Sequence, residues 1–453
     1  TINAANYNTA LGVDVFAALT SGDNNVAVGF GTMGALTSGY SNVAVGANAL
    51  DSATTGHTST AVGHNALTAV TTAAYNTAVG FDAGKAITTG NHNTALGMNA
   101  MNSGTTAHNN TVLGAGGGVS MTDAIGNTIT GMVSGIALTT GDYNIISGYA
   151  AGYAITTGDA NIFMGASAGL HITTGSNNIG IGVNALNTAT TTSGQTAVGH
   201  LALKRITTGA GNTAVGYIAL ENNTTGSYNG AFGQNSLGSN TTGAGNSAYG
   251  YSSGYSTTTG AENTFMGMLS GAYTVLNTTG AYNSMLGAYS HGTAVDTTNA
   301  NVIGYNVAGE TNYTTIGVSG SDIRAANGNV TWATVSDRRV KKDIKDSTAG
   351  LSFINDLRPR TFNFKNKGDL PKEFTGSYEE GSTEVYKNSK TQHGFIAQEV
   401  KETIDNHSDI TDGFSLWNVR ETGQQEVAEA ALIPMLVKAI QELSVEVEKL
   451  KGE

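Results

Sequence analysis

"NTAVGFDAGKAITTGNH" (Asn76 to His92) is one unit of a repeat that fills the first two thirds of the chain. We use the glycine that ends "NTAVG" as the anchor of each unit. Anchors recur every 17 residues from Gly12 to Gly267, a three-residue insertion then moves the next one to Gly287, and the period returns at Gly304. A fixed period of this length indicates a stack of small units and not a single globular core. The eighteen anchors are Gly12, Gly29, Gly46, Gly63, Gly80, Gly97, Gly114, Gly131, Gly148, Gly165, Gly182, Gly199, Gly216, Gly233, Gly250, Gly267, Gly287 and Gly304.

Two other positions of the unit are nearly constant. Asn stands four residues before the anchor in fourteen of the first sixteen units, with Ser59 and Gln195 as the exceptions, and Thr stands eight residues after it from Thr20 to Thr258. Because 17 residues cannot bury a pair of helices, we predict one coil of a parallel β-solenoid per unit, with two short strands and two turns. We expect the Asn and Thr side chains to form ladders along the stack.

The composition changes near Ser336. The chain has 453 residues with 62 glycines, and residues 1–335 hold only 4 Lys/Arg and 12 Asp/Glu, against 17 and 21 in the last 118 residues. All three prolines also lie after that point. We therefore predict a mostly β chain with a repeat solenoid over residues 1–305, a connecting β segment over 306–335, and a small α+β module over 336–453.

Composition also argues against several functions. A net charge of -12 with so few cations in the long module argues against nucleic acid as a partner. No apolar run approaches the roughly 18 residues of a membrane span, so no membrane insertion is expected. The chain lacks cysteine, its histidines show no metal-ligand spacing, and no cofactor or metal is expected. It begins at Thr1 with neither a start Met nor a signal-peptide pattern, as a piece of a longer protein would.

The long module offers three weak functional candidates. The Thr ladder could order water as an ice-binding surface, but adjacent Thr-Thr running into Gly is typical of a turn. The acids are isolated, so no glycosidase pair is identifiable. The tyrosines could bind glycans or could equally be surface or subunit-contact residues; they are Tyr143, Tyr149, Tyr153, Tyr217, Tyr228, Tyr249, Tyr251 and Tyr255.

The last module carries a candidate nucleophile. In "ATVSDRRVKKDI" (Ala333 to Ile344), Ser336 precedes Lys341 by five residues. A Ser hydroxyl becomes a nucleophile when a base takes its proton, and a Lys serves if nearby cations or burial disfavour its charged form. Arg338, Arg339 and Lys342 would act in that direction, whereas Asp337 and Asp343 would oppose it.

The C-terminal segment "ALIPMLVKAIQELSVEVEKLK" (Ala431 to Lys451) predicts a coiled-coil helix over 433–450, because its apolar residues alternate by three and four. β-Branched residues at heptad position a and Leu at position d would by themselves favour a coiled coil of two helices, although the seam is shorter than three heptads. The predicted seam consists of Ile433, Leu436, Ile440, Leu443, Val447 and Leu450.

Both modules resemble known families. The units over about residues 5–305 resemble the head repeats of trimeric autotransporter adhesins, which form left-handed parallel β-rolls, and similar repeats occur in phage fibres. "SDRRVKKDI", "HGFIAQEV" (His393 to Val400) and the C-terminal helix, in that order, closely resemble the intramolecular chaperone auto-processing domain (peptidase S74 type) of phage tail fibres and endosialidase tailspikes. That resemblance implies a homotrimer whose chaperone aligns three chains and is released by self-cleavage between Val335 and Ser336, with Ser336 as nucleophile and Lys341 as general base. His393 could assist or be structural.

These resemblances favour a homotrimeric phage tail fibre, located in the virion and extracellular when mature. Its expected partners are a host cell-surface glycan or protein receptor and other tail proteins, and its only expected enzymatic action is on its own chain. A bacterial surface adhesin with the same chaperone and a glycan-degrading tailspike are the alternatives.

Overall fold

The computed structural model describes residues 5–272, 277–319, 321–328, 333–334, 338, 341–372, 378–407, 410, 416–419 and 424–452. The chain divides into two compact units, Thr1–Val335 and Ser336–Glu453.

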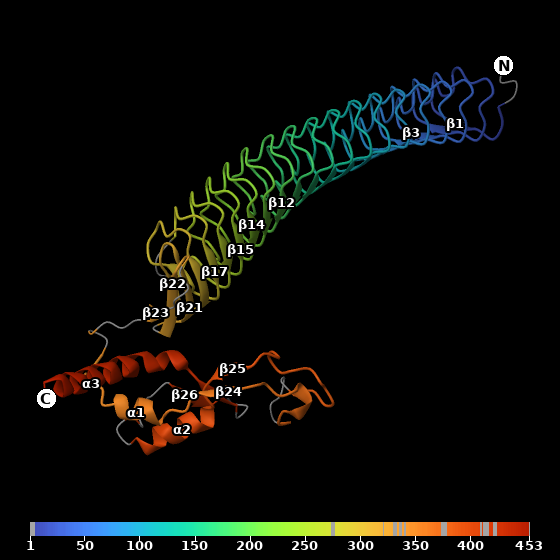
Figure 1. Ribbon diagram of the computed structural model, residues 1–453. Coiled ribbons are helices and arrows are strands. Elements are labelled where there is room, and N and C mark those ends of the chain that lie inside the picture. Colours follow the sequence, from blue (N-terminus) through green and yellow to red (C-terminus); the bar gives the residue numbers. More distant parts are fainter. Residues whose placement is uncertain are drawn as a thin grey trace. The chain divides into compact units, whose positions relative to one another are not determined.

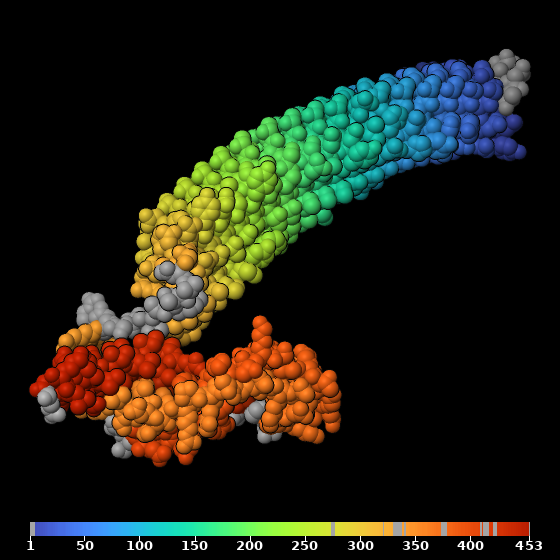
Figure 2. Space-filling view, viewed as in Figure 1, coloured from blue at the N-terminus to red at the C-terminus, as the bar shows by residue number. Residues whose placement is uncertain are grey.

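The first unit is a parallel β-solenoid whose strands lie side by side along one edge of the stacked coils (Figure 1). Each strand pairs in parallel with the strand of the next coil, with Thr77 opposite Thr94 for example, so equivalent residues stack. Figure 2 shows the coils packed closely into one continuous body. The strands are β1 (Thr9–Leu11), β2 (Val26–Val28), β3 (Val43–Val45), β4 (Thr60–Val62), β5 (Thr77–Val79), β6 (Thr94–Leu96), β7 (Thr111–Leu113), β8 (Thr128–Thr130), β9 (Ile145–Ser147), β10 (Ile162–Met164), β11 (Ile179–Ile181), β12 (Thr196–Val198), β13 (Thr213–Val215), β14 (Gly230–Phe232), β15 (Ser247–Tyr249), β16 (Thr264–Met266), β17 (Ser284–Leu286) and β19 (Asn301–Tyr305).

The prediction of two strands per coil was wrong, since the repeating coils from β1 to β17 each contain one three-residue strand in their described residues. The rest of a coil is turn, because the backbone enters the left-handed region at fixed positions. In one coil these are Tyr75, Asp82 and Gly84, with φ of 60°, 54° and 59°. Such residues cannot continue an extended strand. The solenoid is therefore built from one sheet and a set of stacked turns.

The anchor glycines are required by close approach of the backbone. Gly63 has φ of +138°, and a Cβ built on it would lie 2.3 Å from the carbonyl oxygen of Gly80. Any side chain at this position would force successive coils apart. The invariance of the anchor along the chain thus follows from the stacking itself.

The core is a thin column of side chains. In the strands from β2 to β17 the middle residue is buried, whereas the flanking residues are partly or largely exposed. Larger middle residues are matched by glycine elsewhere in the coil: Phe163 is fully buried, and a Cβ on Gly169 would lie 2.6 Å from its ring. Volume is therefore conserved locally, as close packing requires.

The buried Asn residues form a continuous ladder, as predicted. The side-chain oxygen of Asn127 accepts hydrogen bonds from the backbone N–H (2.8 Å) and the side-chain amide (3.0 Å) of Asn144. The Asn144 amide also donates to the carbonyl oxygen of Gly158 at 2.9 Å. Each rung thus satisfies backbone groups that the strand ladder leaves unpaired.

The two exceptions behave differently. Gln195 keeps the ladder, because its amide reaches the carbonyl of Gly209 (2.8 Å) and its oxygen accepts from the side-chain amide of Asn212 (3.2 Å). Ser59 is too short: its hydroxyl accepts only the backbone N–H of Asn76, at 3.3 Å. The coil that contains Ser59 therefore makes fewer ladder hydrogen bonds than its neighbours.

The Thr side chains also form the predicted ladder. The hydroxyl of Thr156 donates to the carbonyl oxygen of Thr173 at 3.1 Å, and the same contact recurs from Thr20 to Thr258 in most coils. These hydroxyls are used to join turns, which supports the turn interpretation over an ice-binding surface.

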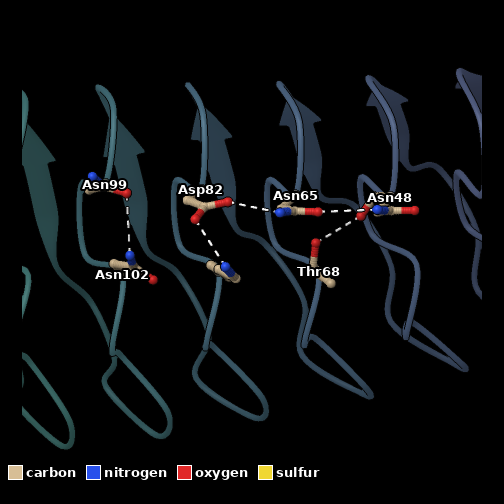
Figure 3. A network of polar contacts seen from close by, with 7 residues as sticks. Asn48, Asn65, Thr68, Asp82, Asn99 and Asn102 are labelled. Carbon is tan, nitrogen blue, oxygen red and sulfur yellow. Dashed lines mark hydrogen bonds and ion pairs between the residues drawn. The ribbon is translucent and has the colours of Figure 1, made fainter.

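A second, shorter polar ladder is formed by the residues two positions after the anchor, whose backbone is in the left-handed region (Figure 3). The amide of Asn48 donates to Asn65, and that of Asn65 donates to Asp82 at 2.9 Å. Lys85 pairs with Asp82 at 3.0 Å. Burial alone would raise the pKa of the Asp82 carboxyl, but the hydrogen bonds from Asn65 and Lys85 and the charge of Lys85 together lower it.

The stack ends in antiparallel strands. After β19, strand β21 (Tyr313–Val318) pairs in parallel with it and then antiparallel with β22 (Ser321–Ala326), which pairs with β23 (Ala333–Thr334). Two short strands, β18 (His291–Gly292) and β20 (Ala308–Gly309), pair beside them. This change of direction ends the repeat.

The second unit is small and α+β, as predicted. Among its described residues, seven buried ones form the core, including Phe353, Val400 and Leu416. Its elements are α1 (Leu351–Asp356), β24 (Arg360–Phe362), η2 (Lys367–Asp369), β25 (Gln392–Gly394), α2 (Ala397–Asn406), β26 (Trp417–Val419), β27 (Gln425–Val427), η3 (Glu429–Leu432) and α3 (Ile433–Lys451).

The thinned rung at Ser59 gives a stability prediction. Ser59→Asn restores amide contacts to Asn42, Asn76 and the carbonyl of Ala73, so we expect a gain of about 1–2 kcal/mol, given roughly 1 kcal/mol net per hydrogen bond. Slower amide hydrogen exchange over residues 55–80 and a higher melting temperature would show it. The matched variant Asn144→Ser should reproduce the loss in an intact part of the ladder. Faster exchange in Ser59→Asn would contradict this account of the ladder.

Candidate functional site

The junction between the two units is where the predicted cleavage site falls. β23 ends at Thr334, and Val335 and Ser336 lie outside the described residues. The division into compact units also falls between these two residues. A break at this bond would leave both folded units intact.

The basic run after the junction is exposed in its described part. The backbone N–H of Lys341 donates to the carbonyl oxygen of Arg338 at 3.2 Å, which closes a turn, and both side chains are exposed. Asp343 follows in the left-handed region, with φ of 53°. In the single chain, Lys341 is thus not shielded from solvent.

The segment His393 to Val400 joins a hairpin to a helix. His393 is exposed on β25, where it pairs with Thr361 of β24. Val400 is buried in the core of the unit, and Glu399 makes a two-point ion pair with Arg360, with contacts of 2.9 and 2.6 Å. The described contacts of this segment are structural.

A polar contact joins the C-terminal helix to α1. The Glu442 carboxylate of α3 accepts the backbone N–H of Leu351 at 2.7 Å, which satisfies one of the unpaired amides at the start of α1. Sequence analysis missed Arg360, Glu399 and Glu442, because contacts spanning 39 and 91 residues leave no spacing signal.

The predicted coiled-coil residues lie on α3 with their side chains largely exposed, from 39% for Val447 to 73% for Leu450. Pro434 occupies the first turn, where a missing N–H is tolerated. An apolar seam this exposed on one helix is typical of a helix that packs in an assembly.

An open groove of about 620 Å³ lies between the two hairpins and α2. Its walls include the aromatic side chains of Phe362, Phe364, Tyr386 and Phe395, together with Glu429. Nothing in the described residues resembles a catalytic pair within it.

The solenoid candidates do not converge on one site. The eight tyrosines named above are all exposed, but they occupy four different positions of the repeat. Among the described residues, no group of three His, Asp or Glu side chains could hold a metal ion, and no helix has the length and apolarity to cross a membrane.

Comparison with known proteins identifies the second unit. Residues 336–409 match the family model described as Peptidase_S74, chaperone of endosialidase. The chain therefore carries a peptidase S74 chaperone domain behind a long β-solenoid. Members of this family are known for autoproteolysis and act in trimeric fibres. No curated protein and no solved structure matches the chain.

The Arg360–Glu399 pair predicts how the stability of the S74 domain depends on pH. The hydrogen bond from Arg360 and the positive charges nearby lower the pKa of Glu399. Its folded pKa is therefore below the unfolded value of about 4.3, so its stabilisation is complete above that pH and is lost as pH falls through the folded pKa.

We expect Glu399→Gln to lower the unfolding temperature of the C-terminal unit at pH 7, with the difference from wild type shrinking below about pH 4. Glu402→Gln, an exposed position on the same helix, is the control and should show little change. A difference that stays constant down to pH 3 would contradict the ion-pair assignment.

Proposed function

We propose that this chain is a subunit of a homotrimeric phage tail fibre, whose S74 domain directs trimer folding and then cuts itself off before Ser336. The carrying observation is that two boundaries coincide at the Val335–Ser336 bond and that the last described strand of the solenoid ends one residue before it. The family match begins at Ser336, the compact units divide there, and the antiparallel end of the solenoid finishes at Thr334.

The proposed cleavage needs only groups of the chain and water. The Ser336 hydroxyl oxygen attacks the carbonyl carbon of Val335 while Lys341, in its neutral form, accepts the hydroxyl proton. The amide C–N bond then breaks, and the proton passes from Lys341 to the leaving amine nitrogen of Ser336. The resulting ester is hydrolysed by water, which leaves a Val335 carboxylate and a free Ser336 hydroxyl.

Assembly offers a reason why cleavage would follow folding. Lys341 is exposed in the single chain, whereas a lysine that acts as a base must be in its neutral form, which burial favours. Packing of three chains through the α3 seam would bury this segment and disfavour the charged form. Cleavage would then report that a trimer has formed.

The fibre body would present the receptor-binding surface. Its turns carry exposed tyrosines such as Tyr143 and Tyr228, which are 66% and 74% exposed and have the chemistry to stack on sugars. The receptor is a host cell-surface glycan or protein in this proposal, and other tail proteins hold the fibre. The acids of the solenoid are isolated, which favours binding over glycan degradation.

Cleavage is tested by substitution on a denaturing gel. The wild-type chain of 46.1 kDa should yield a 335-residue and a 118-residue piece, and Ser336→Ala should remain whole. Lys341→Arg should also remain whole, because Arg keeps its proton at all working pH values. Lys342→Arg is the matched control and should be cut normally. Cleavage of Ser336→Ala would remove Ser336 from the mechanism.

A further inference from the structure

One face of the solenoid is apolar along its whole length. We call it the apolar stripe and define it as the residues directly before and directly after the eighteen anchor glycines, 36 positions in all. None of them is Asp, Glu, Lys or Arg. All but five are Ala, Val, Leu, Ile, Met, Phe or Tyr, the exceptions being His64, Thr130, Ser147, His200 and Gln234.

The stripe is exposed in the single chain because the strand alternates. The middle residue of each strand faces the core, so the residue before the anchor faces outward. Twelve large apolar residues before the anchor and eleven after it are more than a third exposed, including Val215 at 37% and Tyr217 at 49%.

Side chains of the stripe stack in columns from coil to coil. The rings of Phe232 and Tyr249, both directly before an anchor, are stacked with centroids 4.8 Å apart. Those of His200 and Tyr217, both directly after one, are stacked at 5.5 Å. The stripe is thus a continuous surface on which equivalent side chains recur once in every coil.

The charges of the solenoid lie elsewhere on the coil. Lys204 and Glu221 stand five residues after their anchors and approach to 4.0 Å, and exposed Arg205 is the next residue. The solenoid is therefore amphipathic along its length. Exposed apolar patches larger than a few hundred Å² mark interaction surfaces.

The exposed area is large enough for a stable interface. At roughly 60 Å² for each of the 23 exposed side chains, the stripe offers on the order of 1,400 Å², against about 800 Å² per partner in a standard interface.

We propose that the apolar stripe is the surface along which copies of this chain pack lengthwise, coil against coil, in the same direction. The inference rests on the proposed homotrimer and names the surface that holds its body together. A partner must match both the length of the stripe and its spacing per coil, or contacts fall out of phase. A second copy meets both conditions by identity, whereas a charge-free stripe offers few groups to a polar ligand.

The absence of cysteine makes a direct test possible. Val215→Cys places one thiol on the stripe, and Arg205→Cys places one on the charged face of the neighbouring coil. Both variants are expressed from the full-length sequence, purified, sized by sedimentation, oxidised mildly and run on a non-reducing gel. We expect a covalent dimer from most of the Val215→Cys chains and from few of the Arg205→Cys chains.

Register is tested by co-expressing a tagged Val215→Cys chain with an Ile181→Cys chain, so that the S74 domain is present while the trimer forms. Two coils separate these residues, about 10 Å along the axis, so in-register packing should give disulfides only between like positions. Frequent mixed disulfides would overturn lengthwise packing in register.

The outcomes separate this inference from the proposed function. Equal crosslinking at Arg205→Cys, or none at Val215→Cys in a chain that sediments as a trimer, would overturn the stripe as the interface and leave the trimer standing. A wild-type full-length chain that sediments as a monomer would overturn both.

Discussion

The stacking of one coil on the next, 17 residues later, is the constraint on which the rest of this molecule depends. It is enforced at the anchor, where a Cβ on Gly63 would meet the next backbone at 2.3 Å, and at the Asn ladder, where each amide satisfies groups of two neighbouring coils. An unsatisfied buried backbone group costs about 1–3 kcal/mol. One coil therefore stacks on the next only when equivalent residues of the repeat lie opposite each other, and no coil is stable by itself.

The same constraint creates a register problem between chains. Because equivalent coils are nearly identical, a slip of 17 residues preserves the strand ladder and most ladder contacts, so local energetics discriminate poorly between registers. Long-range pairing of this kind is also slow to form. A domain that joins three chains at one end, with an exposed seam on α3, would fix the register before the coils pack. In the proposed trimer, packing of the coils would bury the apolar stripe, and the domain would then no longer be needed.

The period and the Asn and Thr ladders could be predicted because each is a pattern of single residue types at a fixed spacing. The position of the S74 domain was predicted from the resemblance of its motifs to that family. The number of strands per coil could not, since it depends on left-handed turns that residues as different as Tyr75 and Asp82 adopt. Those conformations are imposed by stacking and not by local propensity. The contacts of Glu399 and Glu442 were also hidden, because they join segments far apart in the sequence.

The central claim is that the S74 domain is needed to assemble the solenoid but not to maintain it. Sedimentation of residues 1–335 prepared in two ways tests it most directly. Released by cleavage from the folded full-length chain, this segment should sediment as a soluble trimer, whereas the same segment expressed alone should aggregate or pack out of register. A directly expressed segment that forms the same soluble trimer would contradict the account.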